Sequence, residues 1–93
     1  MKLKTLFKNL PVVFKGNKEV TLTGLSSDSR TVAPGNLFIA KRGLTQDGAQ
    51  FIGQALQAGA AAVLTDLYDP FLSVPQIIHP RPVEIEATLA ARY

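Results

Sequence analysis

The chain has 93 residues, which is enough for one domain and leaves no room for a second independent core. Apolar residues make up 46% of it and charged residues 18%, as in ordinary globular domains, and this composition excludes a disordered chain. There is no cysteine, which excludes a disulfide framework, a cysteine-ligated zinc ion and a thiol nucleophile.

The formal net charge of +3 arises at the amino-terminal end of the chain. Residues 1–18 contain five lysines and no acid, whereas residues 19–93 contain five basic and seven acidic groups. The lysines surround a short predicted helix with no aromatic platform, so we expect no nucleic-acid partner. No segment has the length and hydropathy of a membrane span or a secretory signal, so we expect a cytoplasmic protein without membrane contact.

The first 40 residues predict one short helix and three strands. Four apolar residues among the first ten share one helical face, and Pro11 is expected to end this helix. The apolar run at 12–14 and the alternating pattern at 20–25 predict two strands. The continuous apolar run at 37–40 predicts a strand covered on both faces.

A crossover unit follows this third strand. Asp47 and Gln50 have the spacing of a capping box, and Gly59 suits the end of the helix that they would begin. A buried strand at 60–64 comes directly afterwards. A strand, a helix and a second strand within about 30 residues form a right-handed crossover between parallel strands.

The last third of the chain predicts one more strand and a closing helix. Residues 76–78 form the strand, and Pro82 is well placed to open the helix. Glu84 lies near its start and Arg92 near its end, as the helix dipole favours. The predicted fold is therefore a small three-layer α/β domain, with a largely parallel or mixed sheet and flanking helices. The order of the strands stays open.

Few residues could carry catalytic chemistry. The single histidine, His79, is interpreted as a strand-end or loop residue because no acid–base partner accompanies it. Glu84 and Glu86 are two positions apart on the predicted helix, so they point in different directions and do not form a catalytic pair. No cluster has metal-ligand spacing. We expect neither a catalytic residue nor a metal site in this chain.

Residues 43–48 have the glycine spacing of a phosphate-binding loop. Ala49 and Gln50 stand where that loop requires lysine and a hydroxyl, and Asp47 adds negative charge, so the segment cannot hydrolyse ATP. It is either an ordinary turn before a helix or a ligand loop that offers backbone amides and polar side chains.

Residues 26–30 form a second candidate loop, with three hydroxyls, a carboxylate and a guanidinium. Loops that follow strands of an α/β sheet often bind ligands. The alternative is local: Asp28 can bond backbone amides in an Asx turn and pair with Arg30. The two interpretations are equally supported by the residues alone.

Five linked motifs make the chain resemble a known family. They are Asp-Ser-Arg at 28–30, Pro-Gly-Asn-Leu-Phe-Ile-Ala at 34–40, Asp-Gly at 47–48, Phe-Ile at 51–52 and Gly-Ala-Ala-Ala-Val at 59–63. In this order and spacing the sequence resembles the amino-terminal domain of the Mur ligases MurE and MurF. The Ala-Ala-Arg-Tyr run at 90–93 favours the MurE type.

The resemblance implies that residues 1–93 are the UDP-binding amino-terminal domain of a cytoplasmic, ATP-dependent ligase. That ligase would add meso-diaminopimelate or lysine to UDP-MurNAc-L-Ala-D-Glu in peptidoglycan precursor synthesis. ATP and magnesium would bind a central domain and the amino acid a carboxy-terminal domain, both outside this chain. We therefore expect no cofactor in this domain, and a fragment that is monomeric and inactive alone.

The resemblance also implies which residues contact the UDP moiety. They lie in the two loops that the residues alone left undecided: Ser27, Ser29, Leu44, Thr45 and Gln46. Leu44 departs from the polar residue that the family often has there, so its contact is expected to be apolar or through the backbone. Asp28 and Arg30 are expected to brace the first loop.

Two alternatives remain open at this stage. One is a MurF-type domain from a ligase that adds D-alanyl-D-alanine. The other is a stand-alone nucleotide-binding or scaffolding module without catalysis.

Overall fold

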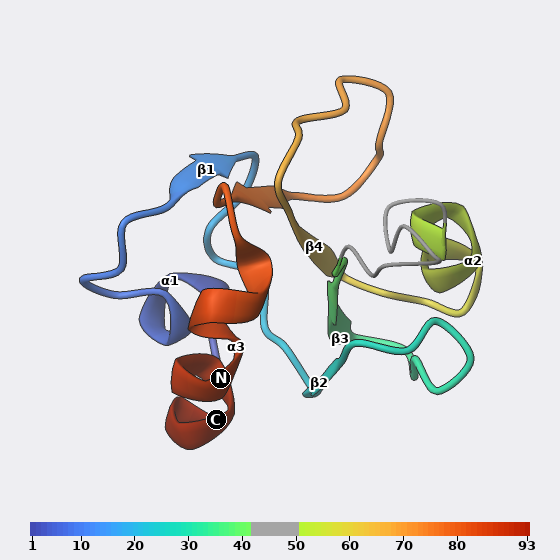
Figure 1. Cartoon of the computed structure of the whole chain (residues 1–93). Coiled ribbons are helices and arrows are strands. Elements are labelled where there is room, and N and C mark those ends of the chain that lie inside the picture. Colours follow the sequence, from blue (N-terminus) through green and yellow to red (C-terminus); the bar gives the residue numbers. More distant parts are fainter. Residues whose placement is uncertain (42–50) are drawn as a thin grey trace.

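The computed structural model of the chain describes residues 1–41 and 51–93. A five-stranded sheet forms the middle layer, in the order β1-β5-β4-β3-β2 (Figure 1). Its strands are β1 (Val13–Lys15), β2 (Gly24–Ser26), β3 (Asn36–Ile39), β4 (Ala62–Thr65) and β5 (Gln76–Ile78). Strands β2 to β5 are mutually parallel, and β1 pairs antiparallel with β5. The predicted mixed, largely parallel sheet is confirmed.

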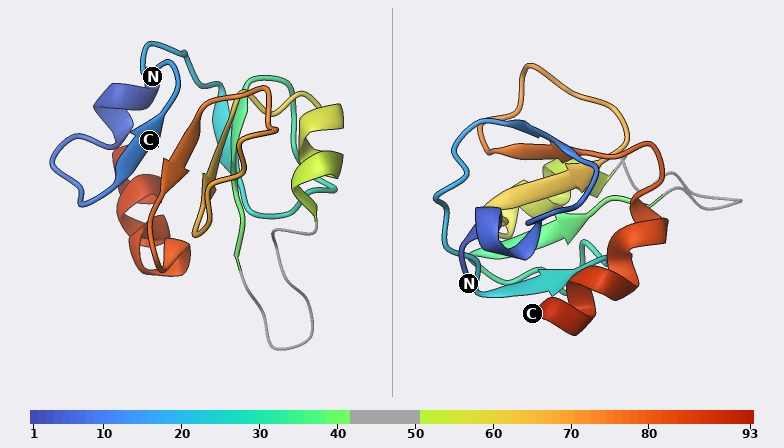
Figure 2. Two further views of the ribbon diagram at one scale, coloured as in Figure 1. Left: turned by 90° about the horizontal axis from the view of Figure 1, so that it is seen from above. Right: turned by 90° about the vertical axis from the view of Figure 1, so that its left-hand side faces the viewer.

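Helices cover both faces of the sheet (Figure 2). Helices α1 (Leu3–Leu6) and α3 (Pro82–Arg92) pack on one face, and α2 (Ile52–Gln57) packs on the other. The three-layer architecture predicted from the sequence is therefore present.

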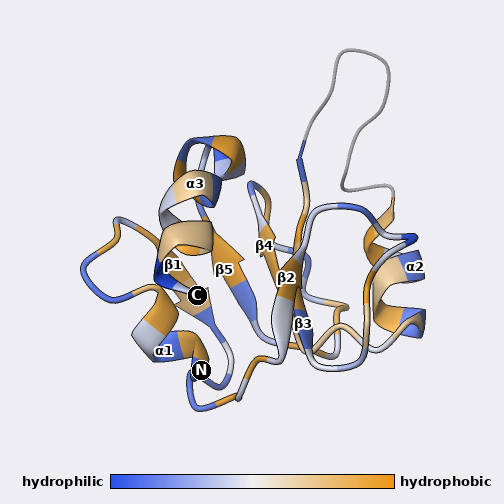
Figure 3. Cartoon of the chain, turned by 90° about the horizontal axis from the view of Figure 1, so that it is seen from below, coloured by the Kyte–Doolittle hydropathy of each residue, from blue (hydrophilic) through white to orange (hydrophobic). Residues whose placement is uncertain are grey.

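Strands β3 and β4 are buried on both faces: their residues are apolar except Asn36 and Thr65, which are buried as well (Figure 3). Side chains alternate between the layers along β3: Leu37 and Ile39 join the core under α1 and α3, and Phe38 joins the core under α2. Leu64 and Val63 divide in the same way on β4. The continuous apolar run at 37–40 thus contributes side chains to the hydrophobic cores on both faces of the sheet.

The predicted crossover is confirmed as far as the described residues reach, since β3 and β4 are parallel neighbours and α2 lies between them in sequence. Helix α2 ends at Gln57 with Ala58 as its C-cap, and the next residue, Gly59, has a φ of 102°, a backbone conformation that glycine adopts without strain. The cap predicted at Asp47 and Gln50 lies outside the described residues.

Two elements are shorter than their sequence patterns predict. Strand β2 begins only at Gly24, because the preceding segment pairs with the start of the chain: Leu3 N–H donates to the Val20 carbonyl and Leu22 N–H donates to the Met1 carbonyl. Helix α1 stops after one turn, and Asn9 beyond it has a φ of 64°. Tertiary pairing and a left-handed residue therefore replace regular structure in these two places.

Within residues 1–41 and 51–93, no helix has the length and apolar character needed to span a bilayer.

Candidate functional site

The first candidate loop leaves the carboxyl end of β2 directly beside β3. Ser26, the last residue of β2, pairs with Phe38 in the parallel register. Lys41 is the last described residue after β3. Because the strands are parallel, the loop from Ser26 and the segment that follows Lys41 start from the same edge of the sheet.

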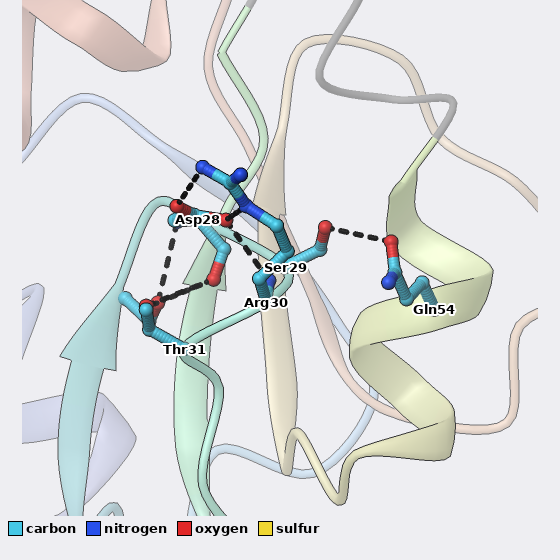
Figure 4. Close-up of polar contacts among 6 residues, drawn as sticks. Asp28, Ser29, Arg30, Thr31 and Gln54 are labelled. Carbon is cyan, nitrogen blue, oxygen red and sulfur yellow. Dashed lines mark hydrogen bonds and ion pairs between the residues drawn. The ribbon is translucent and has the colours of Figure 1, made fainter.

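An Asp–Arg pair braces this first loop, as expected (Figure 4). The Arg30 Nε and terminal NH2 groups donate to the two Asp28 carboxylate oxygens at 3.1 and 2.9 Å, and the Arg30 backbone N–H donates to Asp28 Oδ1 at 2.9 Å. The side-chain bonds from Arg30, followed by this backbone bond, lower the pKa of Asp28 from 3.8 to about 2. The carboxylate is thus ionised at neutral pH and fully engaged within the loop.

Hydroxyl groups close the same loop from the other side. Ser26 Oγ lies 2.9 Å from the Asp28 carbonyl oxygen, to which it donates, and 2.9 Å from Thr31 Oγ1. Thr31 Oγ1 also lies 3.1 Å from the Asp28 carbonyl oxygen. These contacts fix the backbone around Asp28 before any ligand arrives.

The two predicted contact residues of this loop differ in their surroundings. Ser27 is exposed, and its side chain forms no hydrogen bond with the described residues. Ser29 is only 8% exposed, and its Oγ donates to Gln54 Oε1 of α2 at 2.9 Å. Ser27 is free to meet a ligand, and Ser29 ties the loop to the helix that follows the second candidate segment.

The other three predicted contact residues, Leu44, Thr45 and Gln46, lie outside the described residues. The described residues on either side of them are Lys41, which follows β3, and Phe51, which precedes α2.

Gln54 is the residue that motif reasoning missed. Its place on the polar side of α2 was predictable from helical spacing, but its contact with a loop 25 residues away was not. The same helix also borders a pocket of about 470 Å³ at its Ile52 and Gly53 end, and the rest of this pocket is formed by Thr65 and residues 67–72.

Two further polar groups at this edge have structural partners. His79 is buried, and its Nδ1 accepts the backbone N–H of Arg81 at 2.9 Å, which agrees with its interpretation as a strand-end histidine. Lys41 pairs with Glu86 of α3 at 3.2 Å. In the described part of the chain, no group of three His, Cys, Asp or Glu side chains could hold a metal ion.

Comparison with protein families identifies the chain. The family model described as "Mur ligase family, catalytic domain" matches residues 21–92. The chain belongs to the Mur ligase family. The ordered motifs at 28–30, 34–40 and 59–63 all lie within the matched range.

Curated Mur ligases extend the match to the whole chain. The UDP-N-acetylmuramoyl-L-alanyl-D-glutamate–2,6-diaminopimelate ligase of Chlamydia trachomatis serovar D is 45% identical and covers 100% of this chain. The ligases of the same name from Chlamydia muridarum and Bradyrhizobium diazoefficiens are 40% and 39% identical over 100% of the chain. The chain spans about 20% of the length of these relatives, and its sequence is that of a Mur ligase amino-terminal domain of MurE type.

Solved Mur ligases have the same fold. The UDP-N-acetylmuramoylalanyl-D-glutamyl-2,6-diaminopimelate–D-alanyl-D-alanyl ligase of Acinetobacter baumannii superposes with a TM-score of 0.84 at 18% identity, over 98% of this chain and 21% of that one. The MurF ligase of Thermotoga maritima, solved in complex with ADP, gives a TM-score of 0.63 at 27% identity, over 76% of this chain and 16% of that one.

Proposed function

We propose that this domain holds the UDP end of a UDP-MurNAc-peptide for a MurE-type ligase. The observation that carries the proposal is the parallel pairing of β2 with β3, from which the Ser27–Ser29 loop and the segment with Leu44, Thr45 and Gln46 leave at one edge. The curated relatives are named as ligases of UDP-N-acetylmuramoyl-L-alanyl-D-glutamate, which supports a nucleotide ligand for this edge.

The complete ligase would act in the cytoplasm and join a diamino acid to the D-glutamate of this substrate, with ATP and magnesium. The names of the relatives favour 2,6-diaminopimelate over lysine. In this proposal ATP and magnesium bind a central domain and the amino acid a carboxy-terminal domain of the longer protein, since the glycine segment at 43–48 lacks the lysine of a phosphate-binding loop.

A remote anchor contributes to catalysis without touching the reacting atoms. Binding the non-reacting nucleotide positions the peptide end of the substrate and offsets part of the entropy lost on orientation. The Asp28–Arg30 pair and the hydroxyl contacts of Ser26 hold the first loop in one shape, which reduces the cost of ordering it around a ligand.

Titration of the ¹⁵N-labelled domain with UDP tests the proposal. Net hydrogen bonds are individually weak, so we expect a dissociation constant of about 1 mM, with amide shifts confined to residues 27–29 and 44–46. Ser27→Ala and Ser29→Ala should each weaken binding, and Ser73→Ala, an exposed serine of the β4–β5 loop, should not. If saturating UDP shifts neither segment, the proposal is wrong.

The reaction is tested with the longer protein. Supplied with UDP-MurNAc-L-Ala-D-Glu, ATP and magnesium, it should consume 2,6-diaminopimelate in preference to lysine. Turnover of D-alanyl-D-alanine with the corresponding tripeptide precursor would instead assign it to the MurF type.

A further inference from the structure

Gln54 makes the side-chain contact that joins the first loop to α2. Asp28 is occupied by Arg30, and Ser26 by Thr31 and the Asp28 carbonyl, so these side chains bond within the loop. Ser29 instead reaches out of the loop to Gln54 Oε1 at 2.9 Å (Figure 4). Gln54 is itself exposed, so the buried Ser29 hydroxyl lies against a polar group that a ligand can reach.

The direction of this hydrogen bond decides what the pair can offer. A serine hydroxyl carries one proton and two lone pairs, so donation to Gln54 leaves Ser29 Oγ as an acceptor. The Gln54 amide nitrogen has two protons and donates to none of the described residues. The pair therefore presents an acceptor beside a donor.

We propose that Gln54 is a positioning and specificity-determining residue for the nucleobase, because it fixes the hydrogen-bond polarity of Ser29. This inference rests on the proposed binding of UDP by the first loop. Uracil has an N3–H donor flanked by carbonyl acceptors, which complements an acceptor beside a donor. In the orientation in which uracil donates its N3–H to Ser29 and accepts from Gln54 at its 4-carbonyl, cytosine would set its bare N3 against the Ser29 acceptor and its amino group against the Gln54 donor. A binding site penalises such unpaired groups strongly.

Gln54→Glu removes the amide donor proposed to contact the base but keeps the hydrogen bond from Ser29. The glutamate still accepts the Ser29 proton, so the tie between the loop and α2 survives, but it replaces the amide donor with a second acceptor. Affinity for UDP should fall about tenfold, and affinity for CDP should stay equal or rise, so the preference between the two nucleotides is lost or inverted. Gln57→Glu adds the same charge at an exposed position of α2 and should leave the preference unchanged.

Gln54→Leu tests the coupling to Ser29. It should weaken UDP binding severalfold, and the double variant with Ser29→Ala should bind no more weakly than the poorer single variant. Position 54 is exposed, so we expect the thermal unfolding midpoints of Gln54→Leu and Gln54→Glu to stay close to that of the unmodified domain.

The outcomes distinguish this inference from the function on which it rests. If the unmodified domain binds UDP but Gln54→Glu keeps its ratio of UDP to CDP affinity, Gln54 only braces the loop and the inference is overturned. The inference is also overturned if Gln54→Leu and Ser29→Ala weaken UDP binding independently, so that their fold-changes in affinity multiply in the double variant. If UDP shifts neither segment of the unmodified domain, the proposed function fails and the inference fails with it.

Discussion

At the scale of single residues, the first loop is held in shape by its own side chains. The Arg30 side chain, 80% exposed, forms a two-point contact with the half-exposed Asp28 side chain through its guanidinium. Solvent screens such a pair, so it adds little to global stability, but its geometry fixes the backbone between Ser27 and Ser29. Its value lies in presenting these two serines in one arrangement.

The pKa of Asp28 reports directly on this contact. Arg30→Gln removes the guanidinium but keeps the backbone N–H bond, so the pKa should rise from about 2 towards its usual 3.8 without reaching it. Because the folded-state pKa is depressed, the stabilisation is complete above about pH 4 and is lost as the pH falls towards 2. Carboxyl ¹³C shifts followed over this range give the pKa.

Arg81→Gln is the control for this measurement, since Arg81 is similarly exposed and pairs with Glu84 instead. It should leave the Asp28 titration unchanged. An identical Asp28 midpoint in Arg30→Gln and in the unmodified domain would show that the contact does not persist in solution.

At the scale of elements, the sequence pattern predicted the strands and helices whose positions depend on neighbouring residues in the chain. The apolar runs of β3 and β4, the strand between Pro75 and Pro80, and the helix opened by Pro82 all form where the residues indicate. Helix α1 ends before Asn9, which has a positive φ, and β2 falls short because residues 20–22 pair with the chain start, a contact between segments about 20 residues apart. The Ser29–Gln54 bond was unpredictable for the same reason.

Two glycines, one in the first turn of α2 and one just after its C-cap, offer an element-scale test. A Cβ on Gly59 would lie 2.9 Å from Pro34 Cα at a positive φ, whereas a Cβ on Gly53 would meet nothing within 4 Å. Gly59→Ala should therefore destabilise the domain by about 1–3 kcal/mol. Gly53→Ala should raise stability by about 0.5 kcal/mol through helix propensity. Urea denaturation measures both, and equal effects would contradict the assigned backbone.

At the scale of the whole molecule, the two ends of the chain meet on one side of the sheet (Figures 1 and 2). The Leu22 carbonyl accepts from the Met1 ammonium group at 3.3 Å and from the Tyr93 hydroxyl at 3.1 Å. Sequence pattern left the strand order open, and this order now places α1 and α3 together on one face. The opposite face carries α2, whose Gln54 bonds Ser29 of the first loop.

Arg92 links the last helix to the first across this face. Its guanidinium donates to the Leu6 and Lys8 carbonyls at 3.0 and 2.6 Å, where α1 ends and its carbonyls lack helical partners. Arg92→Met keeps most of the aliphatic packing and removes both bonds, so it should lower the free energy of unfolding by about 1–3 kcal/mol. Arg81→Met breaks only an exposed ion pair and should cost less than about 1 kcal/mol.

Because Arg92 lies on the face opposite α2, UDP affinity should be unchanged in the folded variant. A loss of affinity without a loss of stability would mean that the two faces are coupled.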